Sequence, residues 1–272
     1  MRFRLHQCIF VFMDNIIDSS EITGKKIFFL YPTAVVQNNI IFELVQHEYE
    51  VYVARNKDTL RRVLRKYPDS VVFVDVNEKM PEKEWETWIN AVMTAPDTKT
   101  VSIGIISSSE NEEQRNKYLQ TIKIAAGYTM LRFDLDKSIK QILEILQALD
   151  AKGRRKYIRT TTEGDSSTTI NIPMNGAFIN GRIMDISVVG ISFTLEGSPD
   201  IVKNTLVKDV QLILQTSRIK VEGILFGSRM DKKEKIYVLL FSQRVGADAD
   251  LRAKIRKYIQ HNLQARMDIE LR

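Results

Sequence analysis

The chain has 272 residues, of which 44% are apolar and 27% are charged. This ordinary balance excludes a disordered chain and suggests two globular domains. A single cysteine, Cys8, and three well-separated histidines exclude a disulfide framework, argue against a zinc site and suit the reducing cytoplasm. No apolar run approaches the roughly 20 residues that a membrane-spanning helix needs. Residues 1–152 carry 20 basic and 21 acidic side chains, whereas residues 153–272 carry 20 and 13, a net charge of +7. That excess favours either an anionic partner for the second half or simply a solvated basic surface.

We interpret residues 1–24 as an N-terminal extension. Their apolar stretch "CIFVFM" is too short for a secretory signal and has no small-residue cleavage site. Met13 is an alternative start, in which case residues 1–12 add little to the fold.

Residues 25–152 alternate short apolar runs with segments whose apolar residues have helical spacing. The runs predict strands at 25–31, 50–54, 70–76, 100–106 and 127–133. The spaced segments predict helices at 37–49, 57–67, 81–93, 111–125 and 134–152, the last of them capped by Gly153. Strict alternation of this kind predicts an α/β domain in which helices cover both faces of a doubly wound, parallel five-stranded sheet.

Residues 153–272 have a different pattern, with strand-like segments that follow one another without helices. These segments predict strands at 167–173, 176–186, 190–196, 205–214, 219–230 and 235–245. Six short strands in succession indicate an all-β domain, a small antiparallel barrel. Residues 248–267 predict an amphipathic helix that packs against the barrel or plugs it, with apolar residues at i, i+4 spacing: Leu251, Ile255, Ile259 and Leu263.

The spacing RxxxR occurs three times in the chain. In 61–65 and in 252–256 it falls within a predicted helix, where it places both arginines on one solvated face. In "RRKYIR" (154–159) it places Arg155 and Arg159 between the two domains, where a curled linker can turn both guanidinium groups toward one ligand.

A second pattern, DxSxxG, occurs once, in "DISVVG". It consists of Asp185, Ser187 and Gly190 at the end of a predicted barrel strand. Alone it is typical of an ordinary strand-turn segment, in which these three residue types are common.

Together, in this order and on this architecture, the two patterns resemble the PilZ domain family. The resemblance covers about residues 153–265 and implies a six-stranded barrel that binds the bacterial second messenger cyclic di-GMP. The family's binding positions fall on Arg155, Arg159, Asp185, Ser187 and Gly190, without departures.

The chemistry of these side chains fits the ligand that the resemblance implies. Arginines pair with phosphate oxygens or with guanine O6 and N7 and stack on the base. Asp185 can accept from the guanine N1–H and amino group, Ser187 can bond near the same edge, and Gly190 leaves room for close backbone approach. Arg154, at a position that influences whether the family holds one ligand or an intercalated pair, favours the pair. None of these roles needs a nucleophile, a metal or a cofactor, so we expect a binding protein and not an enzyme.

The first half resembles the receiver domain of response regulators. Its third predicted strand ends at Asp75, where a receiver carries its phosphorylated aspartate, and Ser107 can stand for the receiver's hydroxyl residue. The acidic pair that holds Mg²⁺ is replaced by Tyr31 and Pro32, and the lysine by Arg132. Because Mg²⁺ needs several oxygen ligands, we expect a degenerate receiver used for partner contact or dimerisation.

The leading hypothesis is therefore a cytoplasmic effector in which cyclic di-GMP binds the linker and barrel and changes either the arrangement of the two domains or the binding of a partner. Its protein partner is unknown, and the family resemblance implies a role in motility or in surface and biofilm regulation. The alternative is a response regulator phosphorylated at Asp75 with the barrel as output. A nucleic-acid binder is not expected, because no predicted strand face carries the aromatic cluster that base stacking needs.

Overall fold

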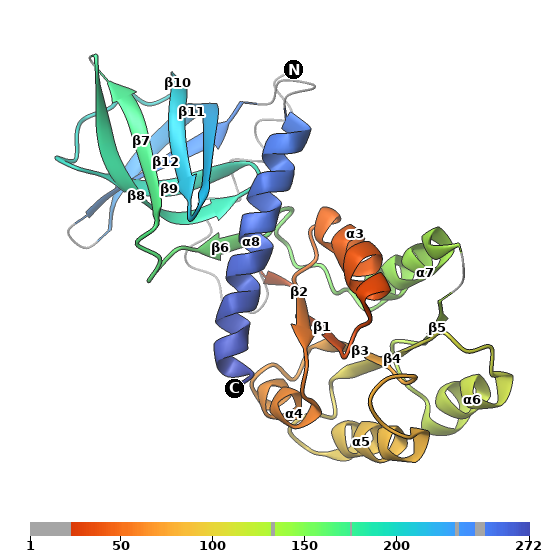
Figure 1. Ribbon diagram of the computed structural model, residues 1–272. Coiled ribbons are helices and arrows are strands. Elements are labelled where there is room, and N and C mark those ends of the chain that lie inside the picture. Colours follow the sequence, from red (N-terminus) through yellow and green to blue (C-terminus); the bar gives the residue numbers. More distant parts are fainter. Residues whose placement is uncertain (1–22, 132–133, 175, 232–233, 243–247) are drawn as a thin grey trace. The chain divides into compact units, whose positions relative to one another are not determined.

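The computed structural model describes residues 23–131, 134–174, 176–231, 234–242 and 248–272. The contacts divide the chain into two units (Figure 1). One is the chain up to Lys156 together with Gln264–Arg272, the α/β unit, and the other is Tyr157–Leu263, the barrel unit. In the described part of the chain, no helix has the length and apolar character needed to cross a bilayer.

The α/β unit is built on five parallel strands in the order β2-β1-β3-β4-β5. The strands are β1 (Ile27–Leu30), β2 (Val51–Ala54), β3 (Val71–Asp75), β4 (Ser102–Ser107) and β5 (Tyr128–Met130). Every residue of β1, β3 and β4 is buried, as expected of central strands covered on both faces. The predicted fold class is therefore confirmed for this half, and its strand order is that of the flavodoxin-like doubly wound sheets.

Helices cover both faces of this sheet, with α3 and α7 on one face and α4, α5 and α6 on the other (Figure 1). They are η1 (Val36–Ile41) running into α3 (Phe42–Gln46), α4 (Lys57–Lys66), α5 (Glu82–Thr94), α6 (Glu112–Asn116) running into η2 (Lys117–Ile122), and α7 (Leu135–Ala148). The prediction that the last helix ends at Gly153 is wrong. The helix ends at Ala148, and Asp150 takes the left-handed conformation, with φ 49°, that was expected of a glycine.

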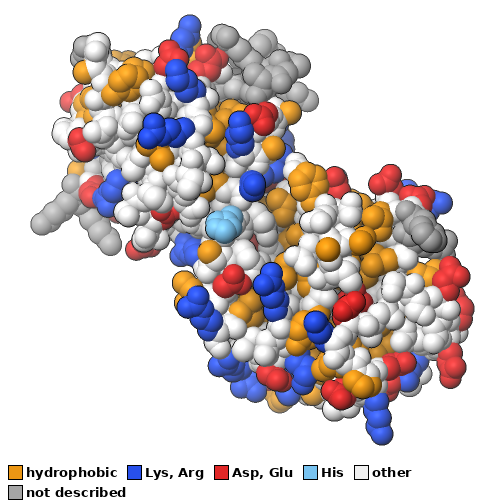
Figure 2. Space-filling model, viewed as in Figure 1, with side chains coloured by type: hydrophobic (Ala, Val, Ile, Leu, Met, Phe, Trp, Pro, Cys, Tyr) orange, Lys and Arg blue, Asp and Glu red, His pale blue; other side chains and the backbone are white. Residues whose placement is uncertain are grey.

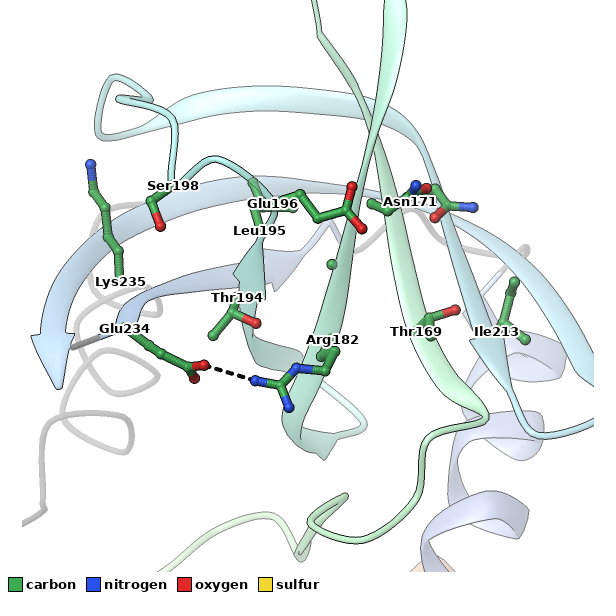
Figure 3. A pocket seen from close by; sticks show the side chains of 12 residues that line it. Thr169, Asn171, Arg182, Thr194, Leu195, Glu196, Ser198, Ile213, Glu234 and Lys235 are labelled. Carbon is green, nitrogen blue, oxygen red and sulfur yellow. Dashed lines mark hydrogen bonds and ion pairs between the residues drawn. The ribbon is translucent and has the colours of Figure 1, made fainter. Parts of the chain in front are cut away.

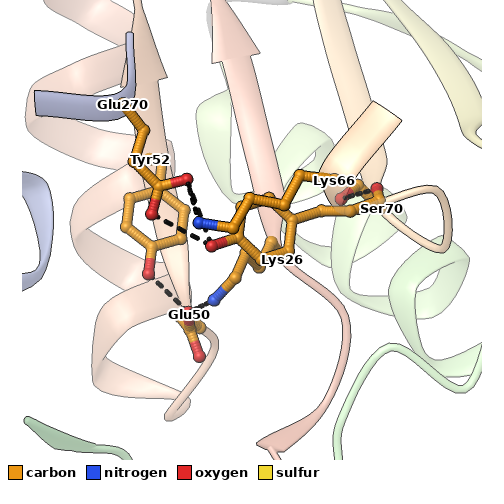
Figure 4. Close-up of polar contacts among 7 residues, drawn as sticks. Lys26, Glu50, Tyr52, Lys66, Ser70 and Glu270 are labelled. Atoms are coloured by element: carbon orange, nitrogen blue, oxygen red, sulfur yellow. Dashed lines mark hydrogen bonds and ion pairs between the residues drawn. The ribbon is translucent and has the colours of Figure 1, made fainter. Parts of the chain in front are cut away.

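The last residues of the chain complete the exposed edge of this sheet. The side-chain amide of Gln264 donates to the Val53 carbonyl (3.0 Å), and its oxygen accepts from the Val53 N–H (2.8 Å), so one side chain pairs with edge strand β2. Met267 is buried, and the Glu270 carboxylate accepts from Lys66 (2.9 Å) and from the Tyr67 hydroxyl (3.0 Å; Figure 4).

A polar cluster lies where strands β1 and β2 begin. Lys26 and the Tyr52 hydroxyl both donate to the Glu50 carboxylate, which is close to fully buried (Figure 4). Burial and the neighbouring Glu50 raise the pKa of Tyr52 well above its usual value. The charge of Glu50 is thus paired and hydrogen-bonded, as a buried carboxylate requires.

The barrel unit is a closed antiparallel barrel with an added strand. The six barrel strands follow the order β8-β7-β10-β11-β12-β9, and the β8–β9 pairing closes the ring. They are β7 (Thr168–Met174), β8 (Ala177–Ser187), β9 (Gly190–Leu195), β10 (Thr205–Leu214), β11 (Ser217–Asp231) and β12 (Glu234–Phe241). This confirms the predicted six-stranded barrel. The sequence did not predict the added strand β6 (Arg159–Thr161), which pairs with β8.

Helix α8 (Asp248–Glu270) contributes to the barrel core, as the spacing of its apolar residues predicted. Ile255 and Ile259 are buried in that core, and Leu251 and Leu263 pack against it. The Tyr258 hydroxyl bonds to Thr168 of β7 (2.9 Å) and donates to Asp165 (3.2 Å). Burial raises the pKa of Tyr258 to about 12, so this hydroxyl stays protonated and available as a donor.

Candidate functional site

Strand β8 changes partners halfway along, and the two sequence motifs meet where it does. Its first half pairs with β7, up to Arg182, and its last residues pair instead with β6. In that second register Arg159 lies opposite Ser187, and Thr161 lies opposite Asp185. Residues directly opposite in an antiparallel pair share a face, so the arginine of the first motif and the aspartate and serine of the second lie on one face.

Strand β9 extends these pairs into two rows. The first row is Arg159, Ser187 and Gly190, and the second is Thr161, Asp185 and Ser192. Ile186, between the two rows on β8, is fully buried in the barrel core, so the rows lie on the outer face of the barrel.

One carboxylate oxygen of Asp185 accepts a hydrogen bond and the other does not. Its Oδ2 accepts a hydrogen bond from the Ser192 hydroxyl, whereas its Oδ1 is buried and makes no hydrogen bond within the described structure. A buried acceptor without a donor is rare in native structures, and it fits a site where a ligand supplies the missing N–H. The sequence did not predict a role for Ser192, because a serine within a strand is identified as a neighbour of Asp185 only when the strand register is known.

Ser187 and Gly190 shape the turn that joins β8 to β9. The Ser187 side chain is fully buried, its hydroxyl donates to the Gly190 carbonyl (3.2 Å), and it accepts from the Val189 N–H (3.4 Å). A Cβ on Gly190 would lie 2.4 Å from the Leu239 carbonyl oxygen, so a side chain is excluded by the neighbouring barrel strand. In this structure both residues hold the strand ends in place.

Arg159 was expected in a curled linker but begins strand β6. The middle residue of that strand, Thr160, donates from its hydroxyl to the Asn262 side chain of α8 (2.6 Å), and both groups are buried. Strand β6 is therefore held between β8 on one side and α8 on the other, and the backbone that carries Arg159 is fixed by both.

Arg154 and Arg155 belong by their contacts to the α/β unit, so the structure assembles Arg159, Asp185, Ser187 and Gly190 within one unit and leaves these two outside it. Arg155 is half-buried, and its Nε is a buried donor with no hydrogen bond to a described residue.

The other two RxxxR pairs lie on helices, as predicted. On α4, the Arg65 Nε forms an ion pair with Asp97 (2.9 Å), and Arg61 donates to the Ala91 carbonyl (3.4 Å). Arg252 and Arg256 lie on α8. The RxxxR spacing of these two pairs is thus explained by their positions on helices.

The receiver-like centre lies at the carboxyl end of the parallel strands. Asp75 ends β3, is 4% exposed and accepts at Oδ1 from the Asn77 N–H (3.2 Å); burial raises its pKa to about 6. The Asn77 Oδ1 accepts from the Ser107 hydroxyl (2.9 Å) and the Ser108 N–H (2.8 Å), which ties the loops after β3 and β4 together. Arg132, the expected substitute for the receiver lysine, lies outside the described residues. Among the residues that are described, no three His, Cys, Asp or Glu side chains are grouped to hold a metal ion.

No family model and no curated protein matches the chain. Three solved structures that it resembles are the cyclic di-GMP-bound PilZ domain of YcgR from Escherichia coli, the Bacillus subtilis inhibitor of motility MotI/DgrA and the Mn²⁺-bound response regulator Rcp1. The YcgR domain has 12% identity and a TM-score of 0.37, with 42% of this chain and 98% of that chain covered. MotI/DgrA has 19% identity and a TM-score of 0.33, over 44% and 53%. Rcp1 has 16% identity and a TM-score of 0.35, over 45% and 92%. The chain is similar to PilZ domains and to a receiver.

The barrel unit also has a polar pocket that no sequence motif predicted. It has a volume of about 560 Å³ and lies on the outer face, over β7, β8, β9 and the start of β12 (Figure 3). An ion pair between Arg182 and Glu234 (2.9 Å) crosses it. Several lining residues, such as Thr169, Asn171 and Thr194, alternate with core residues along their strands, a pattern that only shows that they face outward.

The charges of the barrel unit are interspersed on the face seen in Figure 2, where Lys and Arg side chains lie among acidic and uncharged ones. On this face the basic side chains are scattered and do not gather in one patch. A local arrangement of polar groups, such as the two rows above, therefore distinguishes the candidate site better than net charge does.

Proposed function

We propose that this protein is a cyclic di-GMP-binding effector with no catalytic activity of its own. The ligand contacts Arg159 and Asp185 on the barrel. Arg154 and Arg155 close on it from the linker, while Ser187 and Gly190 keep the turn in the shape that the site needs. The family resemblance suggests a role in motility or in surface-attached growth.

The observation that carries the proposal is the pairing of β6 with the end of β8. It places residues from two motifs, 26 positions apart at Arg159 and Asp185, in adjacent rows on one face. Asp185 Oδ1 is an acceptor and Arg155 Nε a donor that lack hydrogen bonds in the described structure, and the ligand has both donor and acceptor groups. Guanine offers N–H donors to a carboxylate, and phosphate or guanine O6 and N7 offer acceptors to an arginine.

Isothermal titration of the full-length protein with cyclic di-GMP tests this proposal directly. We expect a saturable heat with a Kd in the micromolar range or below. A folded protein that gives no heat at ligand concentrations well above micromolar would rule the proposal out.

We further propose that ligand capture is coupled to the α/β unit through α8. Capture at Arg159 acts on β6, which is bonded to α8 through Thr160 and Asn262. Two residues beyond Asn262, Gln264 pairs with edge strand β2 of the α/β unit. Small-angle scattering with and without cyclic di-GMP measures the coupling as a change in the radius of gyration, and Asn262→Ala should reduce that change while ligand still binds. An unchanged scattering curve at saturating ligand would remove the coupling but leave the binding proposal intact.

In this proposal the α/β unit is a protein-contact module and not a phosphoacceptor. Asp75 and Ser107 supply the carboxyl and hydroxyl groups of a receiver, but the Asn77 side-chain oxygen already accepts from the Ser107 hydroxyl and the Ser108 N–H. Tyr31 and Pro32 follow β1 where a receiver needs two carboxylates. Phosphoryl transfer without the metal loses its main electrostatic stabilisation.

A further inference from the structure

The polar pocket of the barrel continues the proposed ligand site along the same two strands. On β9, Ser192 and Thr194 are two residues apart and therefore share a face, and Thr194 lies opposite Arg182 of β8. One step further, the Glu196 N–H donates to the Asn180 carbonyl (2.9 Å), and Asn180 lies opposite Asn171 of β7. The pocket is thus the third and fourth rows of the face whose first two rows hold Arg159 and Asp185.

Both cations of the pocket are already paired with carboxylates, which argues against a phosphate or other anion there. Arg182 pairs with Glu234 at 2.9 Å, and Lys235 pairs with Asp200 outside the pocket lining. What the pocket offers instead is a set of side chains that make no hydrogen bond or ion pair to any described residue: Asn171, Asn180, Thr194 and Glu196. Figure 3 shows the Glu196 carboxylate on the side toward Asn171, with the Arg182 guanidinium turned to Glu234.

Such a set suits a neutral planar group that carries both donors and acceptors. Guanine presents N1–H and an amino group along one edge, and a carboxylate such as Glu196 can accept from both. Its O6 and N7 accept from arginine, and Arg182 has N–H donors beyond the one that Glu234 uses. Adenine presents an acceptor at N1, so the same carboxylate would reject it. The pocket volume of about 560 Å³ lies within the roughly 300–1,000 Å³ typical of small-molecule sites.

We propose that this pocket receives one guanine of cyclic di-GMP while Asp185 holds the other. This inference rests on the proposed function and extends it to the second base. Glu196 directly follows the end of β9 and is four residues beyond Ser192, the neighbour of Asp185, or roughly 13 Å along an extended chain at about 3.3 Å per residue. The two sugar–phosphate units that join the bases of a cyclic dinucleotide can bridge this span.

The test compares cyclic di-GMP with cyclic GMP–AMP, in which one guanine is replaced by adenine. The wild-type protein should bind cyclic di-GMP about tenfold or more tightly than the hybrid, because the hybrid has only one guanine for two guanine-selective carboxylates. Glu196→Gln should weaken cyclic di-GMP binding by about tenfold and bring the ratio of the two affinities near one, since adenine then enters the pocket without an opposing acceptor.

Asp209→Asn is the matched control, because Asp209 is an exposed carboxylate on β10 outside the pocket and should change neither affinity. If Glu196→Gln keeps both the affinity and the ratio of the wild type, the pocket does not hold a base and the inference is wrong, while the proposed function stands. If the wild type binds neither dinucleotide, the proposed function fails and the inference fails with it.

Discussion

Asp75 in the α/β unit and Asp185 in the barrel unit both lie near the end of a strand, yet their surroundings differ. Asp75 is 4% exposed, its pKa is raised by burial, and the neighbouring Asn77, Ser107 and Ser108 bond to one another. Asp185 has one oxygen fixed by Ser192 and one buried oxygen with no hydrogen bond to a described residue. The Asp185 carboxylate thus has a buried acceptor that a ligand could satisfy, whereas the polar groups around Asp75 bond mainly to one another.

The largest expected effect is on ligand binding at the barrel. Arg159→Ala or Asp185→Ala should weaken cyclic di-GMP binding by roughly 100-fold, because each removes a charge-assisted hydrogen bond from a half-buried site. Isothermal titration measures the loss, and circular dichroism checks that each variant is folded. Arg61→Ala and Arg252→Ala, which remove arginines from helix faces, should bind as the wild type does. Equal weakening by all four would show that the arginine motif was assigned wrongly.

Gly190→Ala should destabilise the barrel unit by about 1–3 kcal/mol. The added Cβ would lie 2.4 Å from the Leu239 carbonyl oxygen, so β9 and β12 would have to move apart. Denaturation followed by far-ultraviolet circular dichroism measures the loss. In the matched control Gly227→Ala, the new Cβ would meet only Lys203 side-chain carbons at 3.8 Å and beyond, and stability should be unchanged. A Gly190→Ala protein as stable as this control would contradict the close approach.

Asp75→Asn should stabilise the α/β unit by about 1–3 kcal/mol at pH 7.5 and have no effect near pH 3.5. The folded protein holds the Asp75 proton up to a pKa of about 6, against a usual value of 3.8, so wild-type stability falls as pH rises through that interval. The asparagine does not titrate and removes this loss. The two tryptophans of the chain, Trp85 and Trp88, lie on α5, so their fluorescence during urea denaturation reports on this unit alone. If the stability of the wild type rises between pH 4 and pH 6 relative to the variant, the pKa of Asp75 is lowered by folding and the prediction is wrong.

Ser192→Ala should weaken cyclic di-GMP binding by about tenfold, because Asp185 loses the bond that directs its other oxygen. Ser192→Thr keeps the hydroxyl and should restore most of the affinity. If alanine and threonine weaken binding alike, Ser192 acts through packing and does not orient Asp185.

The last prediction is that a phosphodonor has no effect on the protein. Incubation with acetyl phosphate and Mg²⁺ should leave the mass of the protein unchanged, because the α/β unit lacks the acidic pair after β1. A mass gain of one phosphoryl group in the wild type that is absent from Asp75→Asn would establish the response-regulator alternative. Asp75 would then be a functional residue, as Asp185 is proposed to be.

The sequence predicted the regular elements well, because apolar spacing reports which face of a strand or helix is buried. It did not predict β6, since "RTT" has no apolar pattern and becomes a strand only by pairing with the end of β8. It also placed the end of α7 at Gly153, although Asp150 supplies the left-handed residue. The role of Ser192 follows from register, and the bond between Gln264 and Val53 joins residues 211 positions apart. Such pairings depend on tertiary structure and leave no local mark.

The pairing of Gln264 with Val53 has a consequence for the order in which the protein is made. Synthesis proceeds from the N-terminus, so all five strands of the α/β sheet leave the ribosome before the barrel does, and Gln264 comes after the last barrel strand. Edge strand β2 therefore lacks this pairing during translation of more than 200 residues, an interval in which an open edge can recruit other chains. The α/β unit is the first to begin folding and the last to be finished.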